Sequence, residues 1–153
     1  MASFGSVAAA LYATVETSRA ALLAISEEEA GRRSGPENWS KKEILGHLID
    51  SASNNHQRFV RLQNADTVVL PSYQENDWVR TQHYGARPWT DLVELWSAYN
   101  RHLAHVIRHA DEKAAGHVWK LPDRDYNLGF LIEDYLTHMQ HHLAQITHAL
   151  TAA

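Results

Sequence analysis

The feature that most constrains the fold is the recurrence of apolar residues at helical spacing in four long stretches. These stretches cover residues 3–25, 40–64, 90–110 and 127–149. In each, apolar side chains return every three or four positions, as one buried face of an α-helix requires. No stretch shows a convincing strand pattern. The sequence therefore predicts an all-α protein, a four-helix bundle whose second and third helices are joined by a long crossover of about 25 residues.

Local start signals support these helix positions. Ser40 followed by Glu43 has the spacing of a capping box. Thr90 and Asn127 are the N-caps that we expect for the third and fourth helices. Ser26, three residues before a glutamate, predicts a further short helical turn.

Two irregular segments separate the helices. Residues 74–82 of the crossover predict a short helix, with Tyr73 and Trp78 as aromatic anchors on the core. Residues 111–126 contain Gly116 and Pro122, and we expect a short extended or hairpin-like piece around Trp119.

Composition narrows the class of protein. A chain of 153 residues with 44% hydrophobic content fits a single domain, residues 1–153, with a continuous core. The absence of cysteine excludes disulfides and thiolate ligands, so any metal must be held by nitrogen or oxygen. A net charge of −4 without a basic cluster argues against nucleic-acid binding. No segment is long enough to span a membrane and none has the pattern of a signal peptide, so we expect a cytoplasmic protein.

A histidine pair marks the fourth helix. His138 and His142 are four residues apart, which places both imidazoles on one face, one turn apart, at the flank of an apolar stripe. This spacing suits two ligands of one metal ion. The alternative is that both are boundary residues, and a third ligand elsewhere is needed to decide between the two interpretations.

The second helix carries a polar stripe that contains a candidate for this third ligand. His47, Ser51, Asn54 and Arg58 follow one another at spacings of four, three and four residues along one edge of the helix. The stripe is either a solvated boundary or the wall of a polar cavity. In the second case His47 is a metal ligand, and Asn54 and Arg58 hold a polar or anionic group.

These residues carry a resemblance to a known family. The segment GHLIDSASNNHQRF, the connector from Tyr73 to Trp78 and the segment HMQHHLAQI resemble the DinB/YfiT-like superfamily of metalloenzymes over residues 39–148. The resemblance implies a four-helix bundle with up-down-down-up topology. It also implies that His47, His138 and His142 hold a divalent metal ion, with zinc and nickel both suited to nitrogen ligands. Three imidazoles would leave coordination positions open for water or substrate.

Each ligand histidine needs its second ring nitrogen oriented by a partner. Asp50 and Asp134 are the candidates by sequence proximity, with exposure at the surface as the alternative for both.

Three functions follow as hypotheses. Relatives of the fold include enzymes that use low-molecular-weight thiols, so the first is a thiol S-transferase acting on a small electrophilic substrate, with Asn54 and Arg58 holding the thiol. The second is metal-dependent hydrolysis of an amide or ester. The third is a non-catalytic, stress-related metal-binding bundle, which a closed site would favour. Apolar margins of the first and third helices also allow a homodimer.

Overall fold

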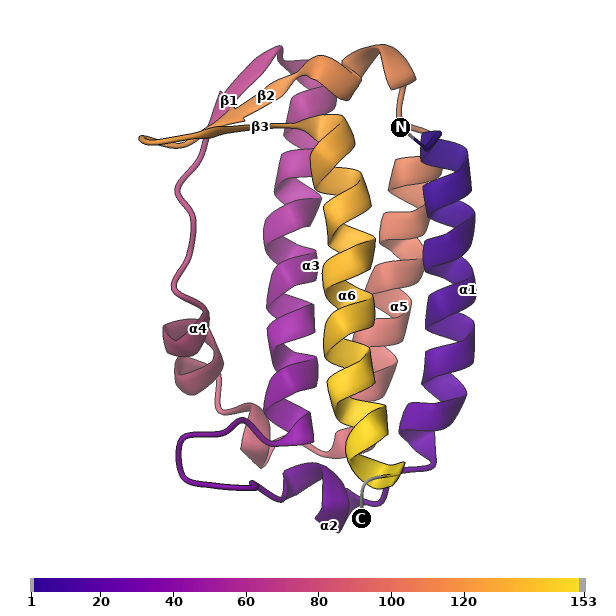
Figure 1. Ribbon diagram of the computed structural model, residues 1–153, viewed down its shortest axis with the longest axis vertical. Helices are drawn as coiled ribbons and strands as arrows, with labels where there is room; N and C mark the ends of the chain where they lie inside the picture. The colour runs from indigo at the N-terminus through magenta and orange to yellow at the C-terminus, as the bar shows by residue number, and fades with distance from the viewer. Residues whose placement is uncertain (1, 152–153) are drawn as a thin grey trace.

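The computed structural model describes residues 2–151, with side chains through residue 148, and its long elements form a four-helix bundle. Helix α1 is packed against α5 and α6, and α3 is packed against the same two helices. Figure 1 shows that α1 and α6 run in one direction and α3 and α5 in the other, which is the expected up-down-down-up order. The bounds are Phe4–Leu23 for α1, Lys41–Asn64 for α3, Trp89–Arg108 for α5 and Leu128–Thr151 for α6.

Most of the predicted helix starts are confirmed. The Ser40 side chain accepts a hydrogen bond from the Glu43 amide, and the Glu43 carboxylate accepts one from the Ser40 amide, which completes the capping box. Ser26 caps the short helix α2 (Glu27–Gly31). At the start of α6 the Asn127 side chain accepts a hydrogen bond from the Phe130 amide at 2.8 Å. These caps satisfy amide groups that the helix itself leaves without acceptors.

The predicted cap at Thr90 is wrong. Helix α5 begins at Trp89, with Pro88 in the cap position and no capping side chain of its own. The Trp89 amide instead donates to the Glu27 carboxylate of α2 at 2.7 Å. A carboxylate that is distant in sequence therefore accepts the hydrogen bond that a local cap would accept. The residues around the helix start do not indicate this contact.

The core fills the centre of the bundle with large apolar side chains. Trp89 and Trp96 of α5 are buried, as is Phe59 of α3. Each such side chain contributes roughly 1.5–3 kcal/mol to folding by leaving water. Within the described residues, no helix combines the length and hydrophobicity that a bilayer span requires.

The crossover leads from the end of α3 back to the start of α5. It contains the short helix α4 (Glu75–Thr81), close to the predicted 74–82, and the 3-10 helix η1 (Tyr84–Ala86). Trp78 is 37% exposed, so its prediction as an anchor is wrong. Val79 and Tyr84 are the buried side chains instead. Tyr84 lies against Gly46 of α3 so closely that a Cβ at Gly46 would overlap its ring.

A small sheet closes one end of the bundle. Strand β1 (Thr67–Val69) pairs in parallel with β2 (Val118–Lys120), and β2 pairs antiparallel with β3 (Asp125–Asn127). The hairpin of β2 and β3 agrees with the expected extended piece, whereas β1 was not predicted from the sequence. Another 3-10 helix, η2 (Glu112–Gly116), links α5 to this sheet. The indole of Trp119 donates to the Leu70 carbonyl at 2.9 Å and so ties the hairpin to the crossover.

Candidate metal centre and its cavity

Three histidines from two helices meet between α3 and α6. His47 of α3 faces His138 and His142 of α6. Each ring offers one nitrogen as a ligand atom, and these three nitrogens lie within 4.8 Å of one another. The Nε2 atoms of His47 and His138 are 3.2 Å apart. The antiparallel packing of α3 against α6 thus brings together the residues that the sequence pattern proposed as ligands.

Burial keeps the imidazoles of His47 and His138 neutral. His47 is fully buried, and desolvation, together with the neighbouring His138 and His142, lowers its pKa to about 3. Desolvation and the adjacent histidines His142 and His141 lower the pKa of His138 to about 4. At neutral pH both rings are therefore uncharged and offer a nitrogen lone pair, which is the form that binds metal.

The donor set fits a divalent cation. Two nitrogen atoms bound to one tetrahedral ion at about 2.0–2.1 Å lie about 3.3 Å apart, close to the His47–His138 separation. In the described part of the chain this is the one group of three or more side chains whose ligand atoms converge in this way. Three nitrogen ligands leave a coordination position for water or substrate.

The orienting partners differ from those that the sequence suggested. The Nδ1 atom of His142 lies 2.8 Å from Oε1 of Gln145, which can accept its proton and leave Nε2 free as a ligand atom. Neither Asp50 nor Asp134 has a hydrogen bond to a histidine ring among the described residues. Gln145 could have been identified from its place three residues after His142 on the same helix.

Asp50 has a different task. Its side chain is 2% exposed, so the alternative of surface exposure is wrong for this residue. Its Oδ1 atom accepts hydrogen bonds from the Tyr84 hydroxyl at 2.6 Å and from the Gln82 amide at 2.7 Å. Burial raises the pKa of Asp50, although both hydrogen bonds oppose this effect. Asp50 therefore fastens the crossover to α3.

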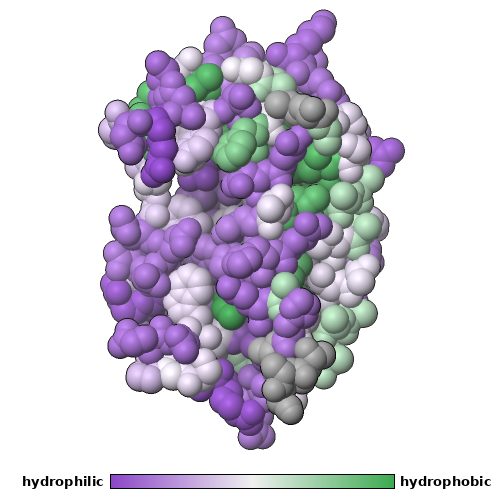
Figure 2. Space-filling view, viewed as in Figure 1, coloured by the Kyte–Doolittle hydropathy of each residue, from purple (hydrophilic) through white to green (hydrophobic). Residues whose placement is uncertain are grey.

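A cavity of about 430 Å³ reaches the histidine cluster at His138. It lies between α3 and α6, and the crossover and the hairpin complete its wall. In the space-filling view hydrophilic side chains dominate the side of the crossover, where the surface is hollowed, whereas hydrophobic ones gather over α1 (Figure 2). The side chains that line the cavity include Ser51, Asn55, Arg58, Tyr73, Glu75, Trp119, Arg124, Tyr126, Phe130, Leu131, Asp134 and His138.

Of the two residues predicted to hold a substrate, the structure places one in this cavity. Arg58 lines the wall, and its guanidinium lies 3.7 Å from the centre of the Trp119 ring. Asn54 is not among the lining residues, and its side-chain amide donates to the Asp50 carbonyl of its own helix at 2.9 Å. Asn55, one position further round the helix, takes its place in the cavity.

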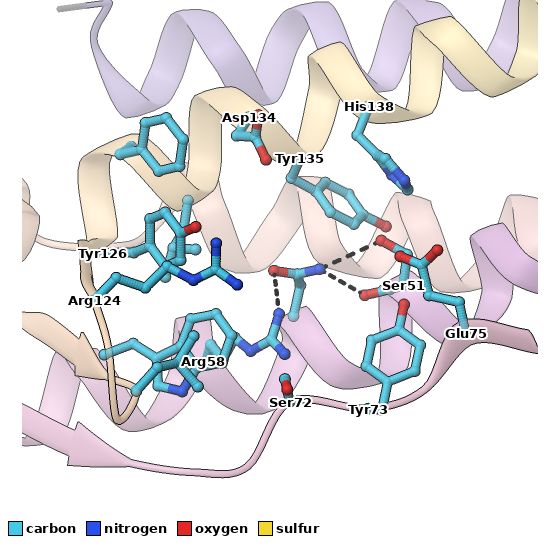
Figure 3. A pocket seen from close by; sticks show the side chains of 15 residues that line it. Ser51, Arg58, Ser72, Tyr73, Glu75, Arg124, Tyr126, Asp134, Tyr135 and His138 are labelled. Atoms are coloured by element: carbon cyan, nitrogen blue, oxygen red, sulfur yellow. Dashed lines mark hydrogen bonds between the residues drawn. The ribbon is translucent and has the colours of Figure 1, made fainter. Parts of the chain in front are cut away.

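Two acidic side chains also line the cavity. Asp134 lies one turn before His138 on α6, and Glu75 comes from the first turn of α4. Figure 3 shows both in the cavity that His138 enters. Sequence reasoning did not single out Glu75, because its position depends on the path of the crossover.

Fold and cluster together define a four-helix bundle with a three-histidine group able to bind a divalent metal. The sequence profile of the DinB superfamily matches residues 10–146, and the chain belongs to this superfamily. The resemblance inferred from the motifs of α3 and α6 is thereby confirmed.

Three curated relatives are named putative metal-dependent hydrolases. The chain is 22% identical to that of Halalkalibacterium halodurans, over 84% of this chain and 75% of the relative. It is 27% identical to those of Oceanobacillus iheyensis and Bacillus mycoides, over 71% of this chain and 63% of each relative. The matches therefore span just under two thirds of the length of these last two proteins.

A solved structure confirms the architecture. YfiT from Bacillus subtilis, described as a probable metal-dependent hydrolase with an unusual four-helix bundle topology, matches with a TM-score of 0.79. The match covers 95% of this chain and 82% of YfiT at 18% sequence identity. The likeness establishes the fold.

Proposed function

We propose that this protein is a metal-dependent hydrolase of small molecules, with His47, His138 and His142 as its metal ligands. The observation that carries the proposal is the cavity of about 430 Å³ that reaches His138, because it gives a substrate access to the histidine cluster. The names of the curated relatives support the same class of reaction. An amide or ester is the bond class that we propose for cleavage.

Each part of the site has a function in such a reaction. A divalent cation held by the three imidazoles supplies Lewis acidity, which polarises a carbonyl and makes water a nucleophile near neutral pH. The neutral state of His47 and His138 keeps their nitrogens available as ligands. Glu75 and Asp134 line the same cavity and are the carboxylates able to accept a proton from water and pass it to the leaving group. Zinc and nickel both suit three nitrogen ligands.

The other two functions expected from the resemblance are less well supported. None of the compared proteins is named as a thiol transferase, so the thiol S-transferase hypothesis receives no support from them. A non-catalytic metal protein is favoured by a closed site, whereas here the cavity extends to His138. Hydrolysis is the reaction that fits both observations.

The first test is the metal content of protein purified without a metal-affinity tag. We expect about one zinc or nickel ion per chain. His47→Ala and His142→Ala should remove it while circular dichroism still shows a folded helical protein. His141→Ala is the matched control, because this exposed neighbour of His142 lies outside the cluster and should leave the metal in place.

The second test is activity. Metal-loaded protein should hydrolyse members of a panel of small amides and esters, and the ligand variants should not. Glu75→Gln should lower kcat by about 100-fold without loss of metal if Glu75 transfers the proton. Wild-type protein that takes up no metal at neutral pH, or a panel that remains blank with metal-loaded protein, would overturn the proposed function.

A further inference from the structure

A buried positive charge lies in the cavity wall without a carboxylate partner. Arg58 is 7% exposed, and among the described residues it forms no ion pair. Its one hydrogen bond runs from Nη1 to the Asn55 side-chain oxygen at 3.3 Å. A buried charge is costly unless it is paired, so proteins seldom keep an unpaired arginine inside without a use for it.

The surroundings fix the direction of this guanidinium. One face rests on the Trp119 ring at 3.7 Å, a cation–π contact that suits arginine. Asn55 is itself held, because its amide donates to the Ser51 carbonyl at 2.9 Å and to the Ser51 hydroxyl at 3.3 Å. Arg58 and His138 both point into the same cavity (Figure 3). Among the described residues, one of the five guanidinium N–H donors has a protein acceptor, which leaves the other four for a ligand.

We propose that Arg58 binds a carboxylate group of the substrate, while the bond to be cleaved lies at the histidine cluster. This inference rests on the proposed hydrolase function and specifies its substrate class. A planar guanidinium matches a carboxylate through two parallel hydrogen bonds, which adds direction to the charge attraction.

Spacing along α3 sets the length of this substrate. Arg58 lies three helical turns after His47, about 16 Å along the axis, and its side chain leans back toward the start of the helix. A molecule that reaches both has its carboxylate roughly 10 Å from the bond that is cleaved. Tyr126 of β3 and Phe130 and Leu131 at the start of α6 also line the cavity, so part of its wall is apolar.

The charges favour a carboxylate over a phosphate. Glu75 and Asp134 also line the cavity and repel a doubly charged anion more strongly than a singly charged one. Arg124, the other lining cation, is exposed and has its own carboxylate neighbour, Asp123, at 3.7 Å. The predicted class is therefore an amide or ester that carries an apolar group and one carboxylate roughly 10 Å from the bond to be cleaved, as the N-acyl derivative of a long ω-amino acid does.

Binding to metal-free protein tests this assignment without any turnover. The probe is N-benzoyl-6-aminohexanoate, with its neutral relative N-benzoyl-6-aminohexanamide and inorganic phosphate as comparisons. Heteronuclear NMR follows the Nε–H signal of Arg58 and the indole signal of Trp119, assigned with Arg58→Lys and Trp119→Phe. N-benzoyl-6-aminohexanoate should shift both signals in a saturable way and bind at least about 10-fold more tightly than either comparison.

Matched variants complete the experiment. Arg58→Gln should weaken the binding of N-benzoyl-6-aminohexanoate at least about 10-fold, as followed at the Trp119 indole. Arg101→Gln should leave this binding unchanged, because Arg101 lies on α5 and pairs with Glu16 at 2.8 Å. If Arg58→Gln does not fold, Arg58→Lys gives the second measurement, since it keeps the charge but lacks the planar fork and should also bind more weakly.

Several results would overturn the assignment. These are equal binding of the neutral amide, preference for phosphate, unchanged binding in the Arg58 variants, or no saturable shift up to about 10 mM. Since neither metal nor catalysis enters the measurement, a carboxylate site in a protein without hydrolase activity would leave this binding result intact while the proposed function fails.

Discussion

Helices α1 and α3 belong to the same bundle, yet they bury different kinds of side chain. Every buried residue of α1 is apolar, from Phe4 to Leu22. On α3 the buried set includes His47, Asp50 and Arg58 beside its leucines. Apolar burial stabilises the fold, whereas polar burial costs free energy unless each group finds a partner. The difference separates a helix that supports the bundle from one that carries its chemistry.

The largest expected effect tests the supporting helix. Leu11 of α1 is fully buried, so Leu11→Ala leaves a cavity and should lower the free energy of unfolding by about 2–5 kcal/mol. Chemical denaturation monitored by circular dichroism measures this loss. Metal content per folded chain should not change, and loss of metal from a protein that remains folded would contradict a purely supporting role.

Replacement of His47 is expected to raise the free energy of unfolding, in contrast to replacement of Leu11. In metal-free protein His47→Leu removes a buried ring whose Nδ1 has no hydrogen-bond partner among the described residues, so it should stabilise the fold. Since folding lowers the pKa of His47 to about 3, the unfolded chain binds more protons below about pH 6.5, and wild-type stability falls as the pH drops toward 3. His47 alone should contribute about 2 kcal/mol of this loss between pH 7 and pH 5.

Denaturation of metal-free protein at both pH values measures this contribution. The variant should show a smaller loss between pH 7 and pH 5 than the wild type. If the free energy of unfolding changes equally with pH in the two proteins, protonation of His47 is not a cause of the loss.

A smaller effect is expected at Gln145, which contacts His142. Gln145→Ala should weaken metal binding by about 10–100-fold, because the imidazole loses the acceptor that orients it. Competition with a chelator of known affinity measures the change. Gln140→Ala, an exposed position on the same helix, is the control and should bind metal as the wild type does.

The smallest effect is expected at Asp50. Asp50→Asn keeps an oxygen for the Tyr84 and Gln82 donors and removes a buried charge, so the free energy of unfolding at pH 7 should change by about 1 kcal/mol or less. Because folding raises the pKa of Asp50, its ionisation disfavours the folded state at neutral pH and this cost disappears as the pH falls. The variant should lack that part of the pH dependence. A loss of several kcal/mol at pH 7 would show that the charge itself is needed.

Sequence patterns predicted the features that depend on near neighbours. The capping box at Ser40 and the pair His138 and His142 lie within one helical turn, so the spacing alone fixes their geometry. The polar stripe made His47 a candidate ligand, and the family resemblance added the up-down-down-up order and the complete set of three histidines. The three histidines met as expected because α3 and α6 pack against each other along their lengths.

Features that depend on distant segments could not be predicted in the same way. Strand β1 has three residues, too few for a periodic signal, and its partner β2 lies about 50 positions further along the chain. The choice between Asn54 and Asn55 depends on a rotation of about 100° around α3, which the crossover and hairpin decide. Thr90 is a residue type that often caps helices, yet at the start of α5 the Glu27 carboxylate accepts the hydrogen bond from the Trp89 amide.

The crossover has a consequence for how such proteins diversify. The histidines stand on two long helices, whereas Tyr73, Glu75 and Trp119 reach the cavity from the crossover and the hairpin. Insertions and substitutions in connecting segments disturb a fold less than changes in its packed helices do. Substitutions in the crossover and hairpin can therefore change which substrates fit the cavity during evolution. The two helices that carry the histidines need not change, so one bundle can accept different substrates.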